Sequence, residues 1–237
     1  MDRVFFRQAD RIWVHTPALR DLVAELTDDP AKIHVIPFGV EDPGVVADPA
    51  RSTDTVEIAF AGSFYPWHGV DELMTAYAQL RDDVPDVHLT IIGDGLTMAD
   101  CESRAQELGI AEAVSFPGWL DRAALYQSLQ RSHIGVAPYL EMQYNYFEPV
   151  KILDYQMAGL PVVASAVGEV PSMVDDGESG MLVPPGDVGA LSSALAKLAL
   201  DPQMRGEMGR AARRRARRIV ETARKVTAVC NELVRAP

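Results

Sequence analysis

Residues 149–165 read PVKILDYQMAGLPVVAS, and this stretch decides the fold. Its first half has the pattern of a short helix, because Pro149 suits the first helical position and Gly159 suits the residue after the last turn. After Pro161 comes Val162–Ser165, a short apolar run bounded by turn signals, which predicts a buried strand. A helix that leads into a buried strand is the repeating unit of a parallel α/β sheet.

The same alternation extends over most of the chain. From residue 56 onward it predicts an α/β fold with a doubly wound parallel sheet, whose strands all end on one edge, where such sheets bind ligands. The predicted strands are Val56–Ala61, Val87–Ile92, Ala113–Phe116, Ile134–Ala137, Val162–Ser165 and Met181–Val183. The predicted helices are about Gly69–Arg81, Met98–Leu108, Arg122–Gln130, Pro149–Ala158, Val170–Val174 and Val188–Leu200, with a long polar helix or helix pair over 202–235.

Before residue 56 the pattern differs. Residues 41–54 are rich in Asp, Pro, Gly and Ser and read as a linker. The elements predicted ahead of it are a helix over 2–9, a strand over 11–16, a helix from Pro17 to about Leu26 capped by Thr16, and a strand over 32–37.

The bulk composition limits the class of protein. The chain has 237 residues, a formal net charge of −12, 48% apolar and 24% charged residues, which is ordinary for a soluble globular protein. No apolar run reaches the ~20 residues that span a bilayer, and the charged, amphipathic start lacks the features of a secretory signal. Cys101 and Cys230 form no metal or redox motif and suit a reducing compartment. We therefore expect a cytoplasmic protein.

Charge is placed unevenly along the chain. Residues 201–237 hold ten Lys/Arg against four Asp/Glu, whereas the rest is strongly acidic. The acidic body argues against nucleic acid as a partner. On a helix, the basic run could touch anionic lipid as a peripheral contact at the inner membrane face. The alternatives are a solvated face, or a face that pairs with the acidic body.

Two further runs extend the deciding stretch. Residues 168–171 read GEVP, and residues 176–187 read DGESGMLVPPGD. In this order and spacing, the three runs resemble the donor-site segment of retaining, family-4-type glycosyltransferases (glycosyl transferases group 1) with the GT-B architecture. The resemblance implies a Rossmann-like domain that binds a nucleotide-sugar.

The resemblance covers nearly the whole chain but only the second half of the two-domain GT-B architecture. It implies that residues 1–44 are the tail end of the N-terminal domain plus linker, and that 45–203 form the nucleotide-sugar (donor) binding domain. Residues 204–237 would form a basic C-terminal helix. The sheet that supplies most of the acceptor site in the family is absent, so we expect a fragment, a chain that works with a separate N-terminal-domain partner, or a relict.

Lys151 and Asp154 lie three residues apart, so they share one helix face. Spacing alone favours a surface helix with one ion pair. The resemblance implies instead that Lys151 contacts the donor phosphates and Asp154 holds the ribose. Where the family commonly has a second acid, eight residues before Asp154, this chain has Tyr146. Glu148 or its backbone is then expected to hold the sugar hydroxyls.

The turns after the first three strands complete the expected site. Where many relatives carry an Arg and a Lys that clamp the diphosphate, this chain has Ser63 and His68. His68 could donate one hydrogen bond to a phosphate, more strongly if protonated, or it could simply pack the loop. The third turn resembles the segment whose backbone reads the base. The predicted donor-binding set is Gly62, Ser63, His68, Gly93, Phe116, Gly118, Tyr146, Phe147, Glu148, Lys151 and Asp154, with Lys151, Glu148 and His68 predicted to act in catalysis.

The resemblance implies transfer of a sugar from a nucleotide-sugar to an unidentified acceptor, with retention of the anomeric configuration and with neither cofactor nor metal. The acceptor would be a glycan, a lipid-linked sugar or a small molecule, and the chain could also form a homo-oligomer. Ser63, His68 and the missing acid favour an alternative: a non-catalytic nucleotide-sugar-binding module that acts with a separate N-terminal-domain partner.

Overall fold

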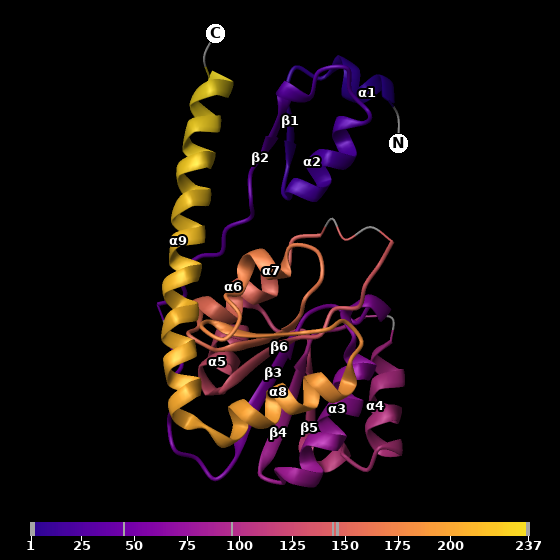
Figure 1. Ribbon diagram of the computed structural model, residues 1–237, viewed down its shortest axis with the longest axis vertical. Coiled ribbons are helices and arrows are strands. Elements are labelled where there is room, and N and C mark those ends of the chain that lie inside the picture. Colours follow the sequence, from indigo (N-terminus) through magenta and orange to yellow (C-terminus); the bar gives the residue numbers. More distant parts are fainter. Residues whose placement is uncertain (1–2, 45, 96, 144, 146, 236–237) are drawn as a thin grey trace.

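The computed structural model describes residues 3–235 except 45, 96, 144 and 146, with the backbone alone for 3 and 229–235. Its centre is a six-stranded, wholly parallel sheet of order β5-β4-β3-β6-β7-β8. The doubly wound α/β fold predicted from the sequence is therefore confirmed (Figure 1). The strands are β3 (Val56–Ala61), β4 (Val87–Ile92), β5 (Val114–Gly118), β6 (Ile134–Ala137), β7 (Val162–Ser165) and β8 (Gly180–Val183).

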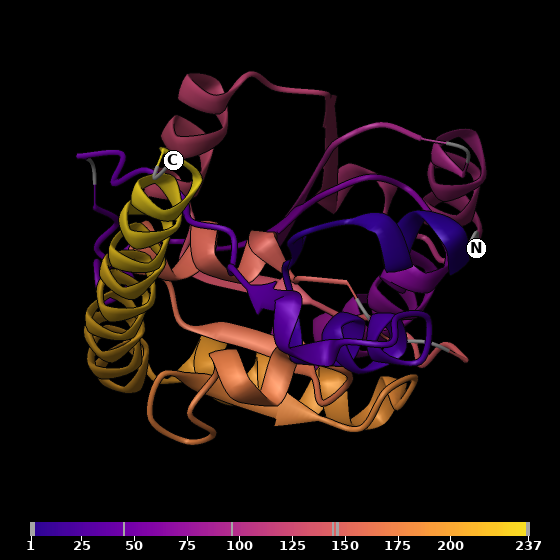
Figure 2. The same cartoon turned by 90° about the horizontal axis from the view of Figure 1, so that it is seen from above.

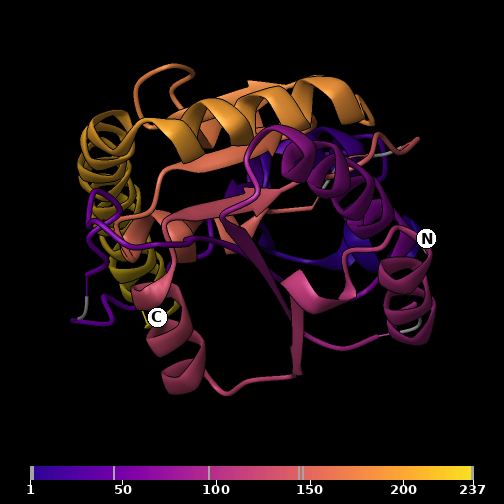
Figure 3. The same ribbon diagram turned by 90° about the horizontal axis from the view of Figure 1, so that it is seen from below.

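Helices cover both faces of this sheet, as Figure 3 shows for α8 and α5. One buried cluster packs the sheet against α3, α4 and α8, and a second packs it against α5, α6 and α7. Pro149 is the N-cap of α6 and not its first helical residue, a small correction to the expectation. The helices are α3 (Val70–Asp83), α4 (Met98–Glu107), α5 (Arg122–Arg131), α6 (Val150–Met157), α7 (Val170–Met173) and α8 (Val188–Leu200), with short 3-10 turns η2 (Pro66–His68) and η3 (Ala111–Ala113).

A smaller unit precedes the sheet. Its two parallel strands pack with α2 around Ile12, Val14, Val23 and Ile33. The Thr16 side chain accepts a hydrogen bond from the backbone N–H of Leu19, the capping expected from sequence. The unit consists of α1 (Arg3–Gln8), β1 (Ile12–Val14), α2 (Pro17–Ala24), η1 (Pro30–Lys32) and β2 (Ile33–Val35), and it lies above the sheet in Figure 1. The predicted domain limits at 44/45 and 203/204 stay predictions.

The C-terminal region is one helix, α9 (Pro202–Arg235), which runs along the edge of both units (Figures 1 and 2). Its buried side carries the small residues Ala212, Ala216 and Ala223 together with Met208 and Val220. These residues recur at intervals of three and four, so α9 has an apolar stripe, which the sequence reasoning did not recognise because alanine is weakly hydrophobic. Part of the basic run pairs with the acidic body, since Arg213 and Arg217 contact Asp42.

Candidate functional site

The strand order reverses between β3 and β6, and the two strands separate there. They pair only at Ile58–Ile134 and Ala59–Gly135. Beyond that point the Tyr155 hydroxyl lies between them: it accepts a hydrogen bond from the Ala61 N–H (2.6 Å) and donates one to the Val136 carbonyl (3.2 Å). Tyr155 thus holds open the crevice in which doubly wound sheets bind ligands.

A cavity of about 430 Å³ lies at this crevice. Loops after β3, β4, β5 and β6 form it together with the first turn of α6. This volume falls in the range of small-ligand pockets. The cavity is lined by Ala61, Gly62, Ser63, Trp67, His68, Ile92, Gly93, Asp94, Trp119, Leu120, Leu125, Tyr139, Phe147, Glu148, Val150, Lys151 and Asp154.

Lys151 projects its ammonium group beneath the turn after β3. Its Nζ lies 4.1 Å from the ring centre of Phe60 and 4.8 Å from that of Tyr139, so two aromatic faces attract the cation. Nζ is buried and has no hydrogen-bond partner among the described residues. A Cβ on Gly62 would lie 2.5 Å from Nζ and 2.9 Å from Cε, so any other residue at this position would displace the lysine side chain.

Burial changes the chemistry of Lys151. Desolvation disfavours the charged form and lowers the pKa of Lys151 to about 7. A buried charge with unmade hydrogen bonds is costly to the fold. An anionic ligand in the cavity would supply the missing partner and favour the charged form.

Asp154 lies deeper on the same helix and faces α5. Its Oδ1 accepts hydrogen bonds from the Tyr126 hydroxyl (2.6 Å) and from Arg122 Nη2 (3.3 Å), and the Arg122 guanidinium stacks over the Tyr126 ring. Burial raises the pKa of Asp154, while Tyr126 and Arg122 oppose that rise. The surface helix with a Lys151–Asp154 ion pair, which spacing alone favoured, is wrong: α6 is largely buried and Asp154 pairs with Arg122.

His68 ends the short turn η2 on the other side of Lys151. Its Nδ1 is hydrogen-bonded to the Ser63 carbonyl, and its ring packs edge-on against Tyr139, with 5.4 Å between ring centres. Burial, and then the nearby Lys151 charge, lower the pKa of His68 to about 4. The protonated form considered from the sequence is therefore disfavoured in the free protein. A neutral ring that donates through Nδ1 has an acceptor at Nε2.

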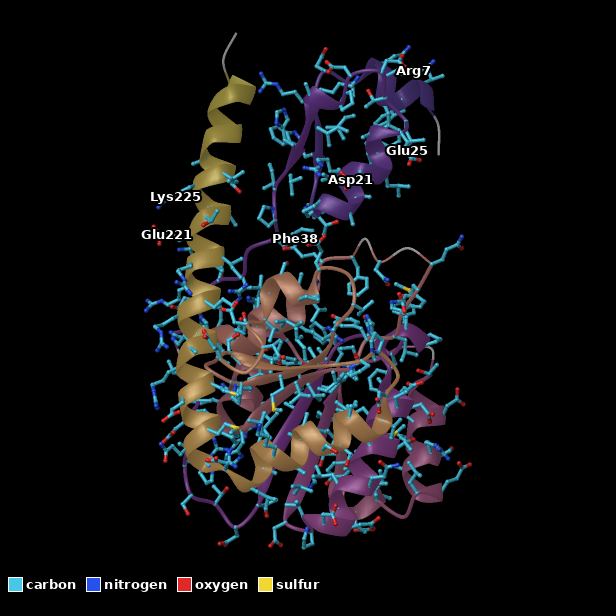
Figure 4. All side chains as sticks on the ribbon, in the orientation of Figure 1. Arg7, Asp21, Glu25, Phe38, Glu221 and Lys225 are labelled. Atoms are coloured by element: carbon cyan, nitrogen blue, oxygen red, sulfur yellow. The ribbon has the colours of Figure 1, made fainter. Side chains whose placement is uncertain are left out.

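Glu148 connects the cavity to the N-terminal unit. Both carboxylate oxygens accept a hydrogen bond from the backbone N–H of Phe38, at 2.9 and 2.8 Å. The Phe38 ring stacks on His15, and Figure 4 shows Phe38 at the end of that unit nearest the sheet. Burial raises the pKa of Glu148, and the Phe38 N–H opposes this rise.

Comparison with known proteins identifies the family. A family profile described as glycosyl transferases group 1 matches residues 55–201. The chain belongs to this family. Among curated relatives, D-inositol 3-phosphate glycosyltransferase from Saccharomonospora viridis is 32% identical over 233 residues, which is 89% of this chain and 52% of that protein. The MMP alpha-(1->4)-mannosyltransferase of Mycolicibacterium hassiacum is 29% identical over 215 residues, 90% of this chain and 51% of that protein. The chain spans about half the length of the curated relatives it matches.

Solved structures agree on the fold. Sucrose-phosphate synthase from Thermosynechococcus elongatus superposes with a TM-score of 0.82 at 24% identity, over 99% of this chain and 61% of that one. Anabaena HepE in complex with UDP and glucose gives a TM-score of 0.78 at 19% identity, over 94% and 63% of the two chains. At these identities the likeness establishes the architecture alone.

Within this glycosyltransferase fold, most of the predicted donor-site residues meet at one cavity. Phe116 and Gly118 do not line it: Phe116 packs against the core, and the Gly118 carbonyl accepts a hydrogen bond from the Gly93 N–H. Trp119, with 74% of its surface exposed, stands at the cavity instead. Tyr146 lies outside the described residues. The cavity residues that the sequence predicted are Gly62, Ser63, His68, Gly93, Phe147, Glu148, Lys151 and Asp154.

Sequence reasoning missed Arg122 and Tyr126, which hold Asp154, and Tyr139, which supports Lys151. Arg122 and Tyr126 are four apart on a predicted helix, so a shared face could be read from spacing. No sequence signal joined that face to Asp154, because the contact spans 32 residues. Among the described residues, no group of three or more His, Cys, Asp or Glu side chains is placed to hold a metal ion. No helix formed by the described residues is long and apolar enough to cross a membrane.

Proposed function

We propose that this chain is the donor-binding half of a retaining GT-B glycosyltransferase, which transfers a sugar from a nucleotide-sugar to an unidentified acceptor. The observation that carries the proposal is Lys151: its buried ammonium has no hydrogen-bond partner in the described residues, and its side chain lines a cavity at the point where the strand order reverses. An unpartnered buried cation in a ligand-sized cavity suits an anionic ligand, and a nucleotide-sugar carries a diphosphate.

Each side chain around the cavity then has a definite task. Lys151 binds the diphosphate and stabilises the negative charge that develops on it as the sugar leaves. Asp154 uses Oδ1 for Tyr126 and Arg122, and its Oδ2 accepts from a ribose hydroxyl. We propose no cofactor and no metal, because Lys151 supplies positive charge where the leaving diphosphate would lie.

His68 and Glu148 suit hydroxyl groups better than phosphate. The Nδ1 of His68 is taken by the Ser63 carbonyl, so a neutral ring offers Nε2 as an acceptor. We therefore propose that His68 contacts a hydroxyl of the sugar or the acceptor. Glu148 contacts the sugar hydroxyls through its carboxylate or backbone once its hydrogen bond from Phe38 is given up or shared.

The alternative is a nucleotide-sugar-binding module without catalytic activity of its own, acting with a separate N-terminal-domain partner. Ser63 and His68 favour it, because they stand where the resemblance leads us to expect two phosphate-clamping cations. In both cases we propose an N-terminal domain, or a second copy in a homo-oligomer, as the partner across the cleft. We also propose a cytoplasmic location, with α9 as a peripheral contact to an anionic membrane surface.

Calorimetric titration with UDP, GDP, ADP and their sugars, with a chelator and no added metal, tests the proposal. We expect one nucleotide to bind, and Lys151→Met to abolish that binding while Lys225→Met, a change on the exposed part of α9, leaves it intact. Absence of nucleotide binding by a folded chain would overturn the proposal. If the nucleotide-sugar binds but the chain with its partner domain never releases nucleoside diphosphate, the non-catalytic module is correct. The anomeric configuration of a product, read by proton NMR, tests retention.

A further inference from the structure

A second cavity, of about 400 Å³, lies between α9 and the linker and shares no lining residue with the donor cavity. Four arginines of α9 line this cavity, which we call the arginine pocket: Arg210, Arg213, Arg214 and Arg217. Their spacing of three, four and seven residues places them on one helix face. The linker residues Val46–Pro49 and Gly159, which follows α6, form the opposite wall.

The helix lies close to the linker just before the arginines begin. A Cβ on Gly209 would lie 2.3 Å from the Gly159 carbonyl oxygen, and one on Gly206 would lie 2.9 Å from Ala50 Cβ. The glycines therefore let the backbones meet, and Gly206 and Gly209 line the pocket together with the arginines that follow them. The shape of the pocket is thus fixed by backbone packing on both walls.

Positive charge exceeds negative charge in this pocket. Asp42 pairs with Arg213 at 3.1 Å and with Arg217 at 3.6 Å, and Asp48 is the acid among the lining residues. Within the residues that the structure describes, no ion pair joins Arg210 or Arg214 to an acid. This local excess occurs in a chain whose net charge is −12. Arg213 is half-buried, whereas Arg210, Arg214 and Arg217 line the pocket from exposed positions on the helix.

We propose that the arginine pocket binds a phosphate-bearing ligand. Guanidinium groups present paired N–H donors that match the oxygens of a phosphate, and this match makes arginine the preferred residue for phosphate recognition. Arg213 is already held by Asp42 and by the Met157 carbonyl, so it is a fixed part of the wall, while Arg210 and Arg214 are free to close on the ligand. The volume suits one head group or phosphorylated small molecule, not a polymer.

This pocket is independent of the proposed donor site. Gly159 at the C-terminal end of α6 lines the arginine pocket, whereas Lys151 at its N-terminal end lines the donor cavity. The arginine-pocket proposal therefore does not depend on the glycosyltransferase proposal, and either one can fail while the other holds. The same phosphate chemistry occurs in a soluble phosphorylated molecule and in the head group of an anionic lipid, so the experiment needs an arm for each.

The test compares two double variants with equal loss of charge. Arg210→Ala/Arg214→Ala removes the two unpaired pocket arginines, and Arg218→Ala/Arg224→Ala removes two exposed arginines of α9 that do not line the pocket. One arm is calorimetric titration with inorganic pyrophosphate. In this arm the donor cavity is either occupied by its nucleotide or made unable to bind a diphosphate by the Lys151→Met substitution. The other is co-sedimentation with phosphatidylcholine vesicles with and without phosphatidylglycerol.

We expect the pocket variant to lose at least about tenfold in affinity in one or both arms, as for the loss of charged hydrogen bonds. The control variant should bind like the wild type, and both should bind the donor nucleotide unchanged. Loss in the pyrophosphate arm identifies a soluble ligand, and loss in the vesicle arm alone identifies a lipid head group. Equal weakening in both variants would mean diffuse surface charge and would overturn the proposal, as would no binding in either arm.

Discussion

Replacing Lys151 by methionine should stabilise the free protein and remove its affinity for a diphosphate. Desolvation lowers the pKa of Lys151 from 10.5 to about 7. At about 1.4 kcal/mol per pH unit, burying this ammonium costs the fold on the order of 4 kcal/mol at neutral pH. Methionine fills the same space without charge but loses attraction to two aromatic rings, about 0.5–1 kcal/mol each. The net gain in unfolding free energy is roughly 2–3 kcal/mol.

The pH dependence separates this mechanism from a simple packing effect. Between about pH 7 and pH 10.5 the unfolded chain holds a proton on Lys151 that the folded chain has released. The unfolding free energy of the wild type therefore rises with pH across this window, and the advantage of the methionine variant shrinks. From about pH 7 to about pH 9, urea unfolding should show that advantage fall by about 2 kcal/mol.

Lys225→Met is the matched control. Lys225 sits on the outer side of α9, 74% exposed and paired with Glu221 (Figure 4), so its substitution should leave the stability profile between about pH 7 and pH 9 unchanged. Diphosphate binding should also restore the charge of Lys151, so at slightly alkaline pH the calorimetric enthalpy should vary with the ionisation heat of the buffer. If Lys151→Met and the wild type show the same pH profile and the same nucleotide affinity, the reasoning is refuted.

Three other predictions concern neighbouring groups. Asp154→Ala should lose about 1.5–3 kcal/mol of nucleotide affinity, as for a hydrogen bond to a charged group, which calorimetry measures. Tyr155→Phe should lower the unfolding free energy by about 1–3 kcal/mol, because the Ala61 N–H and its neighbours lose a buried partner. Stability should fall as the pH drops from 6.5 toward 4, because burial lowers the pKa values of His68 and of His133, a buried residue directly before β6, to about 4, and the unfolded chain gains their protons first. His68→Gln should reduce that acid-side loss in urea unfolding.

Matched variants keep these predictions sharp. Tyr65→Phe removes a hydroxyl from an exposed ring and should leave stability unchanged. Asp121→Asn alters an exposed acid next to α5 and should leave nucleotide affinity intact, since the Asp121 side chain caps α5 through the Ala124 N–H and does not line the cavity. A Tyr155 variant as stable as the wild type would show that the crevice does not depend on this hydroxyl. Acid stability unaltered in His68→Gln would show that His68 is solvated.

The corrections share a common origin in long-range contacts. The sequence placed β3, β4, β6 and β7 at their observed limits, because short apolar runs between amphipathic helices are a local signal. It missed the buried stripe of α9, whose alanines and glycines are weakly hydrophobic. Spacing along the helix also favoured an ion pair between Lys151 and Asp154, because spacing carries no information about the side chains that α5 and β3 place beside them.

What the sequence determined by itself was the order of strands and helices along the chain, the parallel sheet, the family resemblance and eight of the residues that line the crevice. Periodicity, glycine and proline positions and motif order carry this information along the chain. Only the tertiary structure decided the state of those residues: that Lys151 is buried over Phe60 without a described partner, that Asp154 is held by Arg122, and that Glu148 contacts Phe38. Charge state and hydrogen-bond capacity depend on burial and on partners distant in the sequence, which no local pattern records.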